Sequence, residues 1–284
     1  MALRPRHVLI TGGSRGIGLS IAQLFAKNAY RCTLISRSED NLKTAVSSLQ
    51  PLLDTSPASS SPTPSDNTST STAPSTSHSY ITGNISDPNF WTSNNHSSSI
   101  STQLPSPPPK SANHDSKIDV LVNCAGITQS SIFLRTQPSA IEELIQTNLT
   151  GLMIGTRFLM RHGYLRGGKE DTHFSPVIIN LSSLLGVRGG HGAVAYAASK
   201  AGVLGFTRAL ATEYATHRVR VNAIVPGYIE TDMTKDLDAQ GLVGRIPLGR
   251  FGTPEEVAHA ALFLAENQYA HNCVLNLDGG LSAI

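Results

Sequence analysis

Short apolar runs alternate along the chain with longer segments of helical periodicity. Apolar and β-branched runs typical of buried strands occupy 7–11, 31–36, 79–83, 118–123, 176–182, 219–225 and 273–277. Amphipathic segments with helix-starting residues occupy 16–28, 38–50, 138–162, 194–216 and 254–266. Strands that alternate with helices in this way predict an α/β fold. We expect a Rossmann-like, doubly wound parallel sheet of about seven strands with helices on both faces.

Two segments of biased composition interrupt this alternation, one on each side of the short strand at 79–83. Of the 24 residues in 55–78, 19 are Ser, Thr or Pro, and 93–116 is biased in the same way. Such segments bury too little apolar surface to offset the entropy of ordering them. We therefore expect a single domain over 1–284 with disordered inserts at 54–78 and 93–116, beside an edge strand.

The bulk composition excludes several classes of function. The 284 residues carry a net charge of +2, which is too balanced to indicate a nucleic acid as the main partner. No apolar run approaches the length of a membrane span. Three separated cysteines, Cys32, Cys124 and Cys273, and ten scattered histidines show neither a disulfide framework nor metal-ligand spacing. We expect no metal.

A glycine-rich turn joins the first strand to the first helix. In "TGGSRGIG" (11–18), Gly12, Gly16 and Gly18 permit a tight turn and a close backbone approach, and the helix N-terminus presents N–H groups. This arrangement predicts a dinucleotide phosphate site.

The residues at the end of the second strand indicate which dinucleotide the chain binds. A carboxylate there would accept hydrogen bonds from an adenosine ribose, but this chain has Ser36 and Arg37. Arg15 lies in the glycine-rich turn. Because guanidinium groups match phosphate geometry, NADP(H) is favoured over NAD(H).

A tyrosine and a lysine stand four residues apart in "AYAASKAG" (195–202). On a helix, Tyr196 and Lys200 share a face. A neighbouring ammonium group favours the phenolate and would make the Tyr196 hydroxyl a better acid near neutral pH.

These and further motifs resemble the short-chain dehydrogenase/reductase family. They are "TGGSRGIG", "VNCAGI" (122–127), "NLTG" (148–151), "INLSS" (179–183), "YAASK" (196–200) and "VPG" (225–227), in the family's order. "GYIETDM" (227–233) and "RIPLGRFGTPEEVA" (245–258) are similar to the 3-oxoacyl-acyl-carrier-protein reductase branch. The resemblance covers nearly everything outside the two inserts.

The resemblance implies catalytic roles for four residues. Tyr196 would protonate the substrate carbonyl, Lys200 would lower the pKa of Tyr196 and hold the nicotinamide ribose, and Asn148 would bind a relay water. Ser183, rather than the adjacent Ser182, would hydrogen-bond the carbonyl, since it precedes the tyrosine by the family's usual spacing. The implied cofactor-binding residues are Gly12, Ser14, Arg15, Gly16, Ile17, Gly18, Arg37, Asn84, Ile85, Asn123, Ala125, Gly126, Tyr196, Lys200, Pro226, Gly227, Ile229 and Thr231.

The resemblance also implies a reaction, partners and a location. We expect NADPH-dependent reduction of a 3-oxoacyl thioester carried on acyl carrier protein, in fatty acid biosynthesis. A carbonyl, quinone or polyketide ketoreductase is the alternative, and a catalytically silent NADP-binding subunit is the further one, since Cys124 stands where the family commonly has Asn. Relatives are mostly tetramers, so a homotetramer is expected, with a hetero-oligomer possible. The long inserts hint at the mitochondrial matrix, with the cytoplasm as alternative.

A group of basic residues offers a surface for an acidic carrier protein. The group comprises Arg157, Arg161, Arg166, Lys169, Arg218 and Arg220. Such a patch would attract an acidic partner, although an ordinary solvated helix surface explains it equally well.

Overall fold

One parallel sheet organises the molecule. The computed structural model describes residues 4–52, 77–92, 99–106, 117–129, 131–167, 174–237 and 239–283. The strands are β1 (His7–Thr11), β2 (Arg31–Ser36), β3 (Ser79–Thr82), β4 (Val120–Asn123), β5 (Val177–Leu181), β6 (Arg220–Pro226) and β7 (Val274–Leu277). In the sheet they follow the order β3-β2-β1-β4-β5-β6-β7, and every pairing is parallel. This order reverses between β1 and β4, which confirms the predicted doubly wound α/β fold and the edge position of β3.

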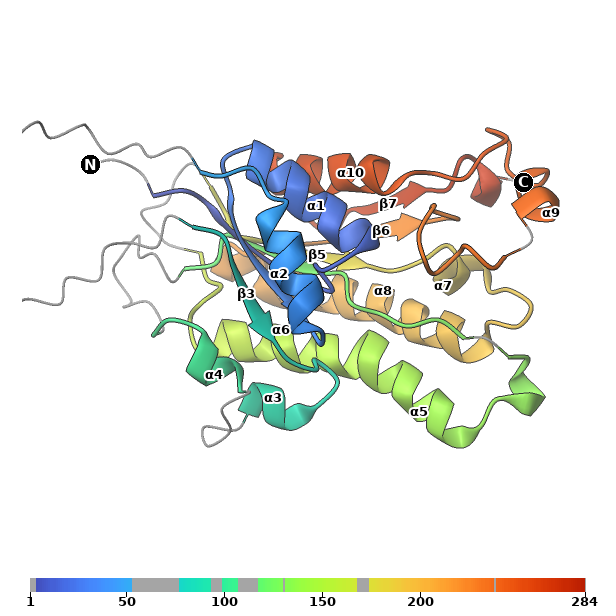
Figure 1. Cartoon of the computed structure of the whole chain (residues 1–284), viewed down its shortest axis with the longest axis horizontal. Coiled ribbons are helices and arrows are strands. Elements are labelled where there is room, and N and C mark those ends of the chain that lie inside the picture. The colour runs from blue at the N-terminus through green and yellow to red at the C-terminus, as the bar shows by residue number, and fades with distance from the viewer. Residues whose placement is uncertain are drawn as a thin grey trace, which may run out of the picture.

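Helices cover both faces of the sheet. They are α1 (Gly16–Lys27), α2 (Glu39–Ser47), α3 (Pro88–Thr92), α4 (Ile100–Gln103), α5 (Pro138–Ile145), α6 (Gly151–Arg161), α7 (Leu185–Arg188), α8 (Val194–Tyr214), α9 (Ala239–Val243) and α10 (Pro254–Glu266). Figure 1 shows α1, α2 and α10 over one face and α5, α6 and α8 over the other. Figure 1 shows α9 beyond the tip of β6 and α7 near α8 at the same end of the sheet.

The strands alternate their side chains between two apolar layers. In β1, Val8 and Ile10 belong to the core under α1 and α10, whereas Leu9 belongs to the core under α6 and α8. All three are fully buried. Because both faces of a doubly wound sheet are covered, its strands are apolar along their whole length, which is why they could be recognised as continuous runs.

The long helix predicted over 138–162 is interrupted by a wider turn. The structure has α5, then a π-helical turn at Gln146–Thr150, then α6. Asn148 lies within this turn and is completely buried. π-helical turns inside α-helices often mark functional sites, because the extra residue redirects a side chain.

The prediction that 93–116 is disordered is wrong for its middle portion. Within the described residues 99–106, α4 buries Ile100 fully, and Leu104 joins the same core cluster as Trp91. The Tyr164 hydroxyl donates a 2.7 Å hydrogen bond to the Pro105 carbonyl oxygen. Two apolar residues four apart suffice to fold one turn against α3, even in a serine-rich segment. The prediction of disorder over 54–78 is also wrong at its end, because the Cys32 amide donates a 3.1 Å hydrogen bond to the His78 ring, which also contacts the Gln50 carbonyl oxygen. Residues 54–76, 93–98 and 107–116 lie outside the described residues.

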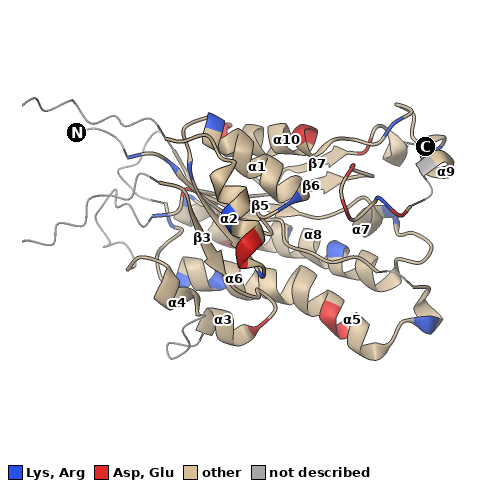
Figure 2. Ribbon diagram, in the orientation of Figure 1, with Lys and Arg blue, Asp and Glu red and all other residues tan. Residues whose placement is uncertain are grey.

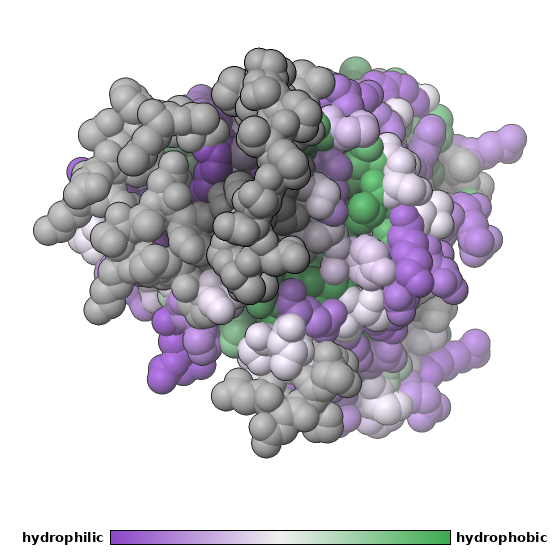
Figure 3. Space-filling model, turned by 60° about the vertical axis from the view of Figure 1, so that its left-hand side comes forward, coloured by the Kyte–Doolittle hydropathy of each residue, from purple (hydrophilic) through white to green (hydrophobic). Residues whose placement is uncertain are grey.

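The described surface carries polar and apolar residues side by side (Figure 3). Among the coloured residues of Figure 3, hydrophilic ones predominate, with hydrophobic residues exposed in places between them. Across the described ranges, no helix combines the length and apolar character needed to cross a membrane. No group of three or more His, Cys, Asp and Glu side chains suited to a metal occurs in that part of the chain.

Candidate active site

The turn between β1 and α1 forms a cradle of backbone atoms. Gly12 has φ +71°, and a Cβ on it would lie 2.7 Å from the Ala125 Cα. A Cβ on Gly18 would collide with the carbonyl oxygen of Gly12. No side chain caps the N-terminus of α1, so its first-turn amides face the cradle. Only glycine allows the turn to pack this closely on itself and on the loop after β4, and the resulting cradle of backbone atoms suits the pyrophosphate of a dinucleotide.

A hollow of about 520 Å³ opens from this cradle along the carboxyl ends of the strands. Twelve of the residues predicted to bind the cofactor line it: Gly12, Ser14, Arg15, Gly16, Ile17, Gly18, Arg37, Asn84, Ile85, Ala125, Gly126 and Thr231. Residues that the sequence analysis did not assign also line it: Ile35, Ser36, Gly83, Cys124, Ile127, Thr128, Thr147, Asp232, Met233 and Lys235. Several of these directly follow or end a strand, which is the signal that could have found them.

The end of the hollow beside β2 is polar and basic. Arg15 and Arg37 both line it, and the hydroxyl of Ser14 donates a 2.9 Å hydrogen bond to that of Ser36. Arg15 also contacts Asp232 at 3.4 Å, but both side chains are largely exposed, so this ion pair holds Arg15 weakly. Both guanidinium groups are therefore free to turn toward a phosphate.

Three of the four predicted catalytic side chains meet where α8 faces the end of β5. The Lys200 ammonium nitrogen lies 5.8 Å from the ring centroid of Tyr196. Ser183 lies beside the Tyr196 hydroxyl and acts to lower the pKa of that phenol, and the Ser183 oxygen accepts a 3.2 Å hydrogen bond from the Leu185 amide. All three side chains are at least nine-tenths buried, so water has little access to their polar atoms.

Ser182 and Ser183 contact different residues of α8. The Ser182 hydroxyl donates a 2.7 Å hydrogen bond to the carbonyl oxygen of Lys200, on the backbone of α8. Ser183 instead faces Tyr196. The structure thus directs the serine chosen from its spacing, and not its neighbour, toward the tyrosine.

Burial sets the protonation of the pair on α8. It raises the pKa of Tyr196 above 10.0, against a smaller lowering by the Ser183 hydrogen bond. It lowers the pKa of Lys200 from 10.5 to about 8. We expected Lys200 to lower the pKa of Tyr196, but the net shift is upward, because loss of hydration at the phenol outweighs the polar contacts. Tyr196 is therefore fully protonated at neutral pH and available as an acid.

Asn148 holds the loop after β4 against the helices. Its side-chain oxygen accepts from the Ile127 amide at 2.8 Å, and its nitrogen donates to the Ile127 carbonyl and to the Ser199 hydroxyl. A Cβ on Gly126 would lie 3.2 Å from the Asn148 oxygen and 3.4 Å from the Lys200 nitrogen. Asn148 therefore lies close to Lys200, and Gly126 leaves the space between them open.

The interpretation of Asn123 as a cofactor-binding residue is wrong for its side chain. Its amide nitrogen donates to Asn180 at 2.9 Å and to Thr156 at 3.1 Å, between β4, β5 and α6. Asn180 in turn donates to Thr207 on α8. This buried chain of amides and hydroxyls fixes α8 against the sheet, so Asn123 supports the site from behind.

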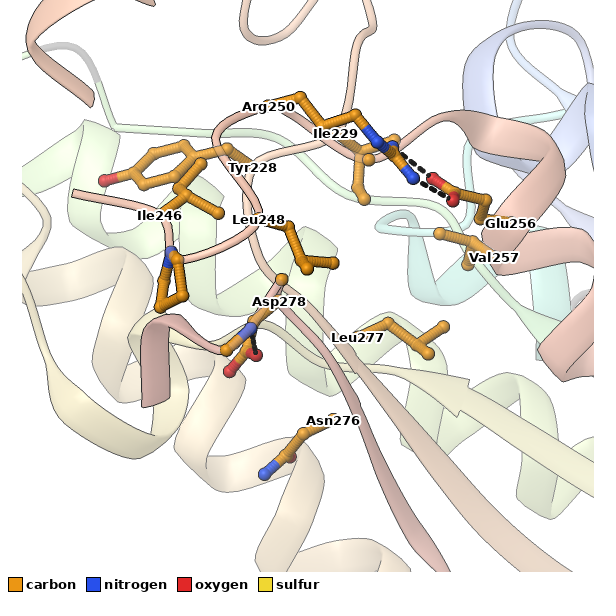
Figure 4. A pocket seen from close by; sticks show the side chains of 14 residues that line it. Tyr228, Ile229, Ile246, Leu248, Arg250, Glu256, Val257, Asn276, Leu277 and Asp278 are labelled. Carbon is orange, nitrogen blue, oxygen red and sulfur yellow. Dashed lines mark hydrogen bonds and ion pairs between the residues drawn. The ribbon is translucent and has the colours of Figure 1, made fainter. Parts of the chain in front are cut away.

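Three residues at or just after the end of β6 also lie away from the dinucleotide hollow. Pro226 and Gly227 do not line it; a Cβ on Gly227 would lie 2.8 Å from the Asp278 Cα. Ile229 is buried and lines a second hollow of about 450 Å³ beside the end of β7. Figure 4 shows this second hollow, in which Tyr228, Ile246 and Leu248 lie near one another.

The second hollow is closed on one side by an ion pair. Arg250 contacts Glu256 through two hydrogen bonds of 2.9 and 2.6 Å, drawn as dashed lines in Figure 4. Glu256 also caps α10 through the amide of Thr253. None of Ser183, Tyr196 and Lys200 lines this hollow.

The structure divides the basic group between buried and exposed positions. Arg220 is buried and donates to carbonyl oxygens of Leu264, Ala265 and Ala270 at the end of α10. Arg161 and Arg218 are exposed, but they precede β5 and β6 and so lie at the amino edge of the sheet, opposite the site. In Figure 2, blue and red positions are scattered over the elements. Lys169 lies outside the described residues.

Comparisons with known proteins agree with this geometry. The family model described as "short chain dehydrogenase" matches residues 6–68, and one described as "Enoyl-(Acyl carrier protein) reductase" matches 110–282. The chain belongs to the short-chain dehydrogenase/reductase family. It is similar to a rat protein named 3-oxoacyl-[acyl-carrier-protein] reductase, at 35% identity over 96% of both chains. A zebrafish protein named carbonyl reductase family member 4 is 33% identical over 98% of this chain and 99% of its own.

A solved structure shares the fold. The crystal structure of a 3-ketoacyl-(acyl-carrier-protein) reductase from Brucella melitensis, complexed with NADH, superposes with a TM-score of 0.77. It is 24% identical and covers 99% of this chain and all of its own. The family members are oxidoreductases that use a nicotinamide dinucleotide, and the glycine cradle of this chain fits such a cofactor.

Proposed function

We propose that the protein is an NADPH-dependent reductase of 3-oxoacyl thioesters carried on acyl carrier protein, acting in fatty acid biosynthesis. The observation that carries the proposal is the meeting of Ser183, Tyr196 and Lys200 at the carboxyl edge of the sheet, next to a dinucleotide hollow. The names of the rat and human relatives, which are 35% and 34% identical, support the substrate class.

The three side chains have separate tasks. Tyr196, protonated at neutral pH, gives its phenolic proton to the substrate carbonyl oxygen, which becomes the hydroxyl oxygen of the product. Ser183 donates a hydrogen bond to the same oxygen while negative charge develops on it. The bound NADPH supplies the hydride that the carbonyl carbon accepts. After the reaction, the phenolate regains a proton from solvent.

Lys200 and Asn148 support this proton transfer. The Lys200 ammonium group favours the phenolate left on Tyr196 and is oriented by its 2.9 Å hydrogen bond to the Leu181 carbonyl oxygen. Asn148 fixes the Gly126–Ile127 backbone beside that ammonium group. The predicted water relay through Asn148 remains part of the proposal.

The preference for NADPH rests on Arg15 and Arg37. Both line the β2 end of the hollow, where Ser36 stands in place of a carboxylate. A 2′-phosphate would meet two guanidinium groups there and no negative charge from the end of β2.

The first experiment follows NADPH absorbance with acetoacetyl-acyl-carrier-protein as substrate. We expect turnover with NADPH, much slower turnover with NADH, and loss of turnover in Tyr196→Phe. Tyr214→Phe, at the far end of the same helix, is the matched control and should retain turnover. If no 3-oxoacyl thioester is reduced while NADPH still binds, the fatty acid assignment fails.

A second candidate is a reductase of small carbonyl compounds or quinones. The zebrafish relative named carbonyl reductase family member 4 favours it. A panel of ketones and quinones, assayed against the same variants, separates it from the first: reduction of the panel at rates above those with the thioester would favour the second candidate. A silent subunit would bind NADPH and reduce neither.

We also propose a homotetramer in the mitochondrial matrix. The open edge of β7, the hollow beside it, and the exposed side chains of Leu248, Phe263 and Tyr269 offer apolar surface for a second copy. Light scattering after size exclusion measures the assembly, and a monomer would rule the tetramer out. Protease protection in fractionated cells tests the location.

A further inference from the structure

The helix that carries Tyr196 begins without a cap of its own. Position Ala193, just before α8, makes no side-chain hydrogen bond to the first turn. The first amides of a helix have no acceptor within it, so those of Ala195 and Tyr196 need another partner. The Ala197 amide is the first to find an acceptor at the start of the helix. It donates to the Ala193 carbonyl oxygen at 2.7 Å.

Gln129 supplies that partner from a distant part of the chain. Its side-chain oxygen accepts hydrogen bonds from the amides of Ala195 at 2.9 Å and Tyr196 at 3.3 Å. These are the second and third residues of α8, whose amides a local Ser, Thr or Asp cap would normally bind. Gln129, 66 residues earlier, thus does the work of an N-cap residue.

The other end of the Gln129 amide is anchored as well. Its nitrogen donates to the Ser131 carbonyl oxygen at 2.6 Å and to the Thr136 hydroxyl at 3.2 Å. The Ser131 and Thr136 hydroxyls hydrogen-bond one another at 2.9 Å. Four hydrogen bonds therefore fix the Gln129 side chain between the loop after β4 and the start of α8.

We propose that Gln129 is a positioning residue for catalysis, which holds the backbone of Tyr196 so that its phenol meets Ser183. The inference rests on the proposed role of Tyr196 as the acid. A tyrosine in the first turn of an uncapped helix would fray with that turn. A small displacement of the phenol from its place in the site would slow proton transfer. Cofactor binding would be unaffected, because Gln129 does not line the dinucleotide hollow.

The test compares Gln129→Met, which keeps the length of the side chain but loses the acceptor, with Gln129→Glu, which keeps the acceptor. We expect kcat of Gln129→Met to fall about 10- to 100-fold, with the KM for NADPH unchanged and the pH profile of kcat displaced. Gln129→Glu keeps the acceptor, and a carboxylate suits a helix N-terminus, but it loses both bonds that the amide nitrogen donates. Its kcat should therefore lie between those of Gln129→Met and the wild type. If Gln129 only stabilised the fold, the activity of Gln129→Met would fall in proportion to its folded fraction. Its pH profile of kcat would then match that of the wild type.

Thr136→Val is the matched control, because it loosens the loop but leaves the two contacts to α8. Its kcat should stay near that of the wild type. Equal losses in Thr136→Val and Gln129→Met, or a kcat of Gln129→Glu no higher than that of Gln129→Met, would overturn the proposal.

Amide hydrogen exchange tests the contact without any activity. In the wild type, the Ala195 and Tyr196 amides should exchange slowly despite their place in the first turn, and they should also do so in Gln129→Glu. Rapid exchange in the wild type would refute the contact even if Gln129→Met failed to fold. If the wild type reduces no substrate but both amides are protected, the proposed function fails and the cap stands.

Discussion

The ammonium nitrogen of Lys200 lies 5.8 Å from the ring centroid of Tyr196, one helical turn away on α8. The spacing fixes this relationship, since residues four apart share a helix face. The spacing does not determine the free-energy cost of burying a cation at this position. Lys200 is buried, and its pKa falls from 10.5 to about 8 as a result. The site therefore holds a buried cation at the expense of stability.

Replacing Lys200 should separate function from stability. Between pH 8 and 10.5 the unfolded chain holds a proton on Lys200 that the folded chain has lost, so wild-type stability rises with pH there, and below pH 8 the full penalty acts. We expect Lys200→Met to abolish turnover and to raise the free energy of unfolding at pH 7, by at most about 3 kcal/mol. Urea unfolding at pH 7 and pH 10 measures the difference, which should shrink at the higher pH. Lys43→Met, at an exposed position, is the control, and equal stability of Lys200→Met and wild type at both pH values would contradict this account.

Arg37 should control the choice of dinucleotide. Arg37→Asp places a carboxylate at the β2 end of the hollow, where it repels a 2′-phosphate and can accept hydrogen bonds from a ribose. We expect the KM for NADPH to rise about tenfold or more, from the loss of one charge-assisted contact, while the KM for NADH falls. Steady-state kinetics with both cofactors measure the change. Arg157→Asp on the exposed surface of α6 should leave both KM values as they are, and unchanged KM values in Arg37→Asp would remove Arg37 from the site.

Much of the fold and the centre of the site could be predicted because they depend on local rules. The strands of a sheet covered on both faces are apolar throughout, and a glycine-rich turn needs its glycines wherever the chain goes. The Tyr196–Lys200 face follows from helix geometry alone. Each of these signals lies within a few residues of sequence.

The predictions that failed depend on long-range packing. Asn123 ends a strand buried on both faces, so its sequence neighbours do not reveal that its side chain meets Asn180 rather than the cofactor. Arg220 is buried because α10, far along the chain, ends with its carbonyl groups beside β6. Ile100 and Leu104 stand in a segment whose average composition hides them. The sequence did not reveal the role of Gln129, because the residue that caps a helix N-terminus normally lies next to that helix in the chain.

Gly155 should be essential for the packing of α3 against α6. A Cβ on Gly155 would lie 2.6 Å from the indole ring of Trp91, which is fully buried and has little room to move. Gly155→Ala should therefore lower the free energy of unfolding by about 1–3 kcal/mol. Because Trp91 is the single tryptophan of the chain, its fluorescence reports the same displacement directly. Gly205→Ala on α8, where a Cβ would meet nothing within 4 Å, is the control and should not destabilise the protein.

The buried His7 should make the protein sensitive to mild acid. Burial is the largest cause that holds the pKa of His7 well below 6.5, and the nearby Arg31 and Arg4 lower it further. The folded state therefore resists protonation of His7 while the unfolded chain accepts it. Stability is complete above pH 6.5 and declines as the pH falls below that value toward the folded-state pKa.

His7→Gln should flatten this decline. Glutamine does not titrate and can retain one contact of the ring, which binds the Thr33 hydroxyl at 2.8 Å. The free energy of unfolding, measured in urea at pH 7.5 and pH 5.5, should differ less between the two pH values in His7→Gln than in the wild type. His259→Gln, at an exposed position on α10, should keep the wild-type difference. If His7→Gln and the wild type lost the same stability between pH 7.5 and pH 5.5, other groups would govern the acid response. The folded chain would then protonate His7 at no free-energy cost.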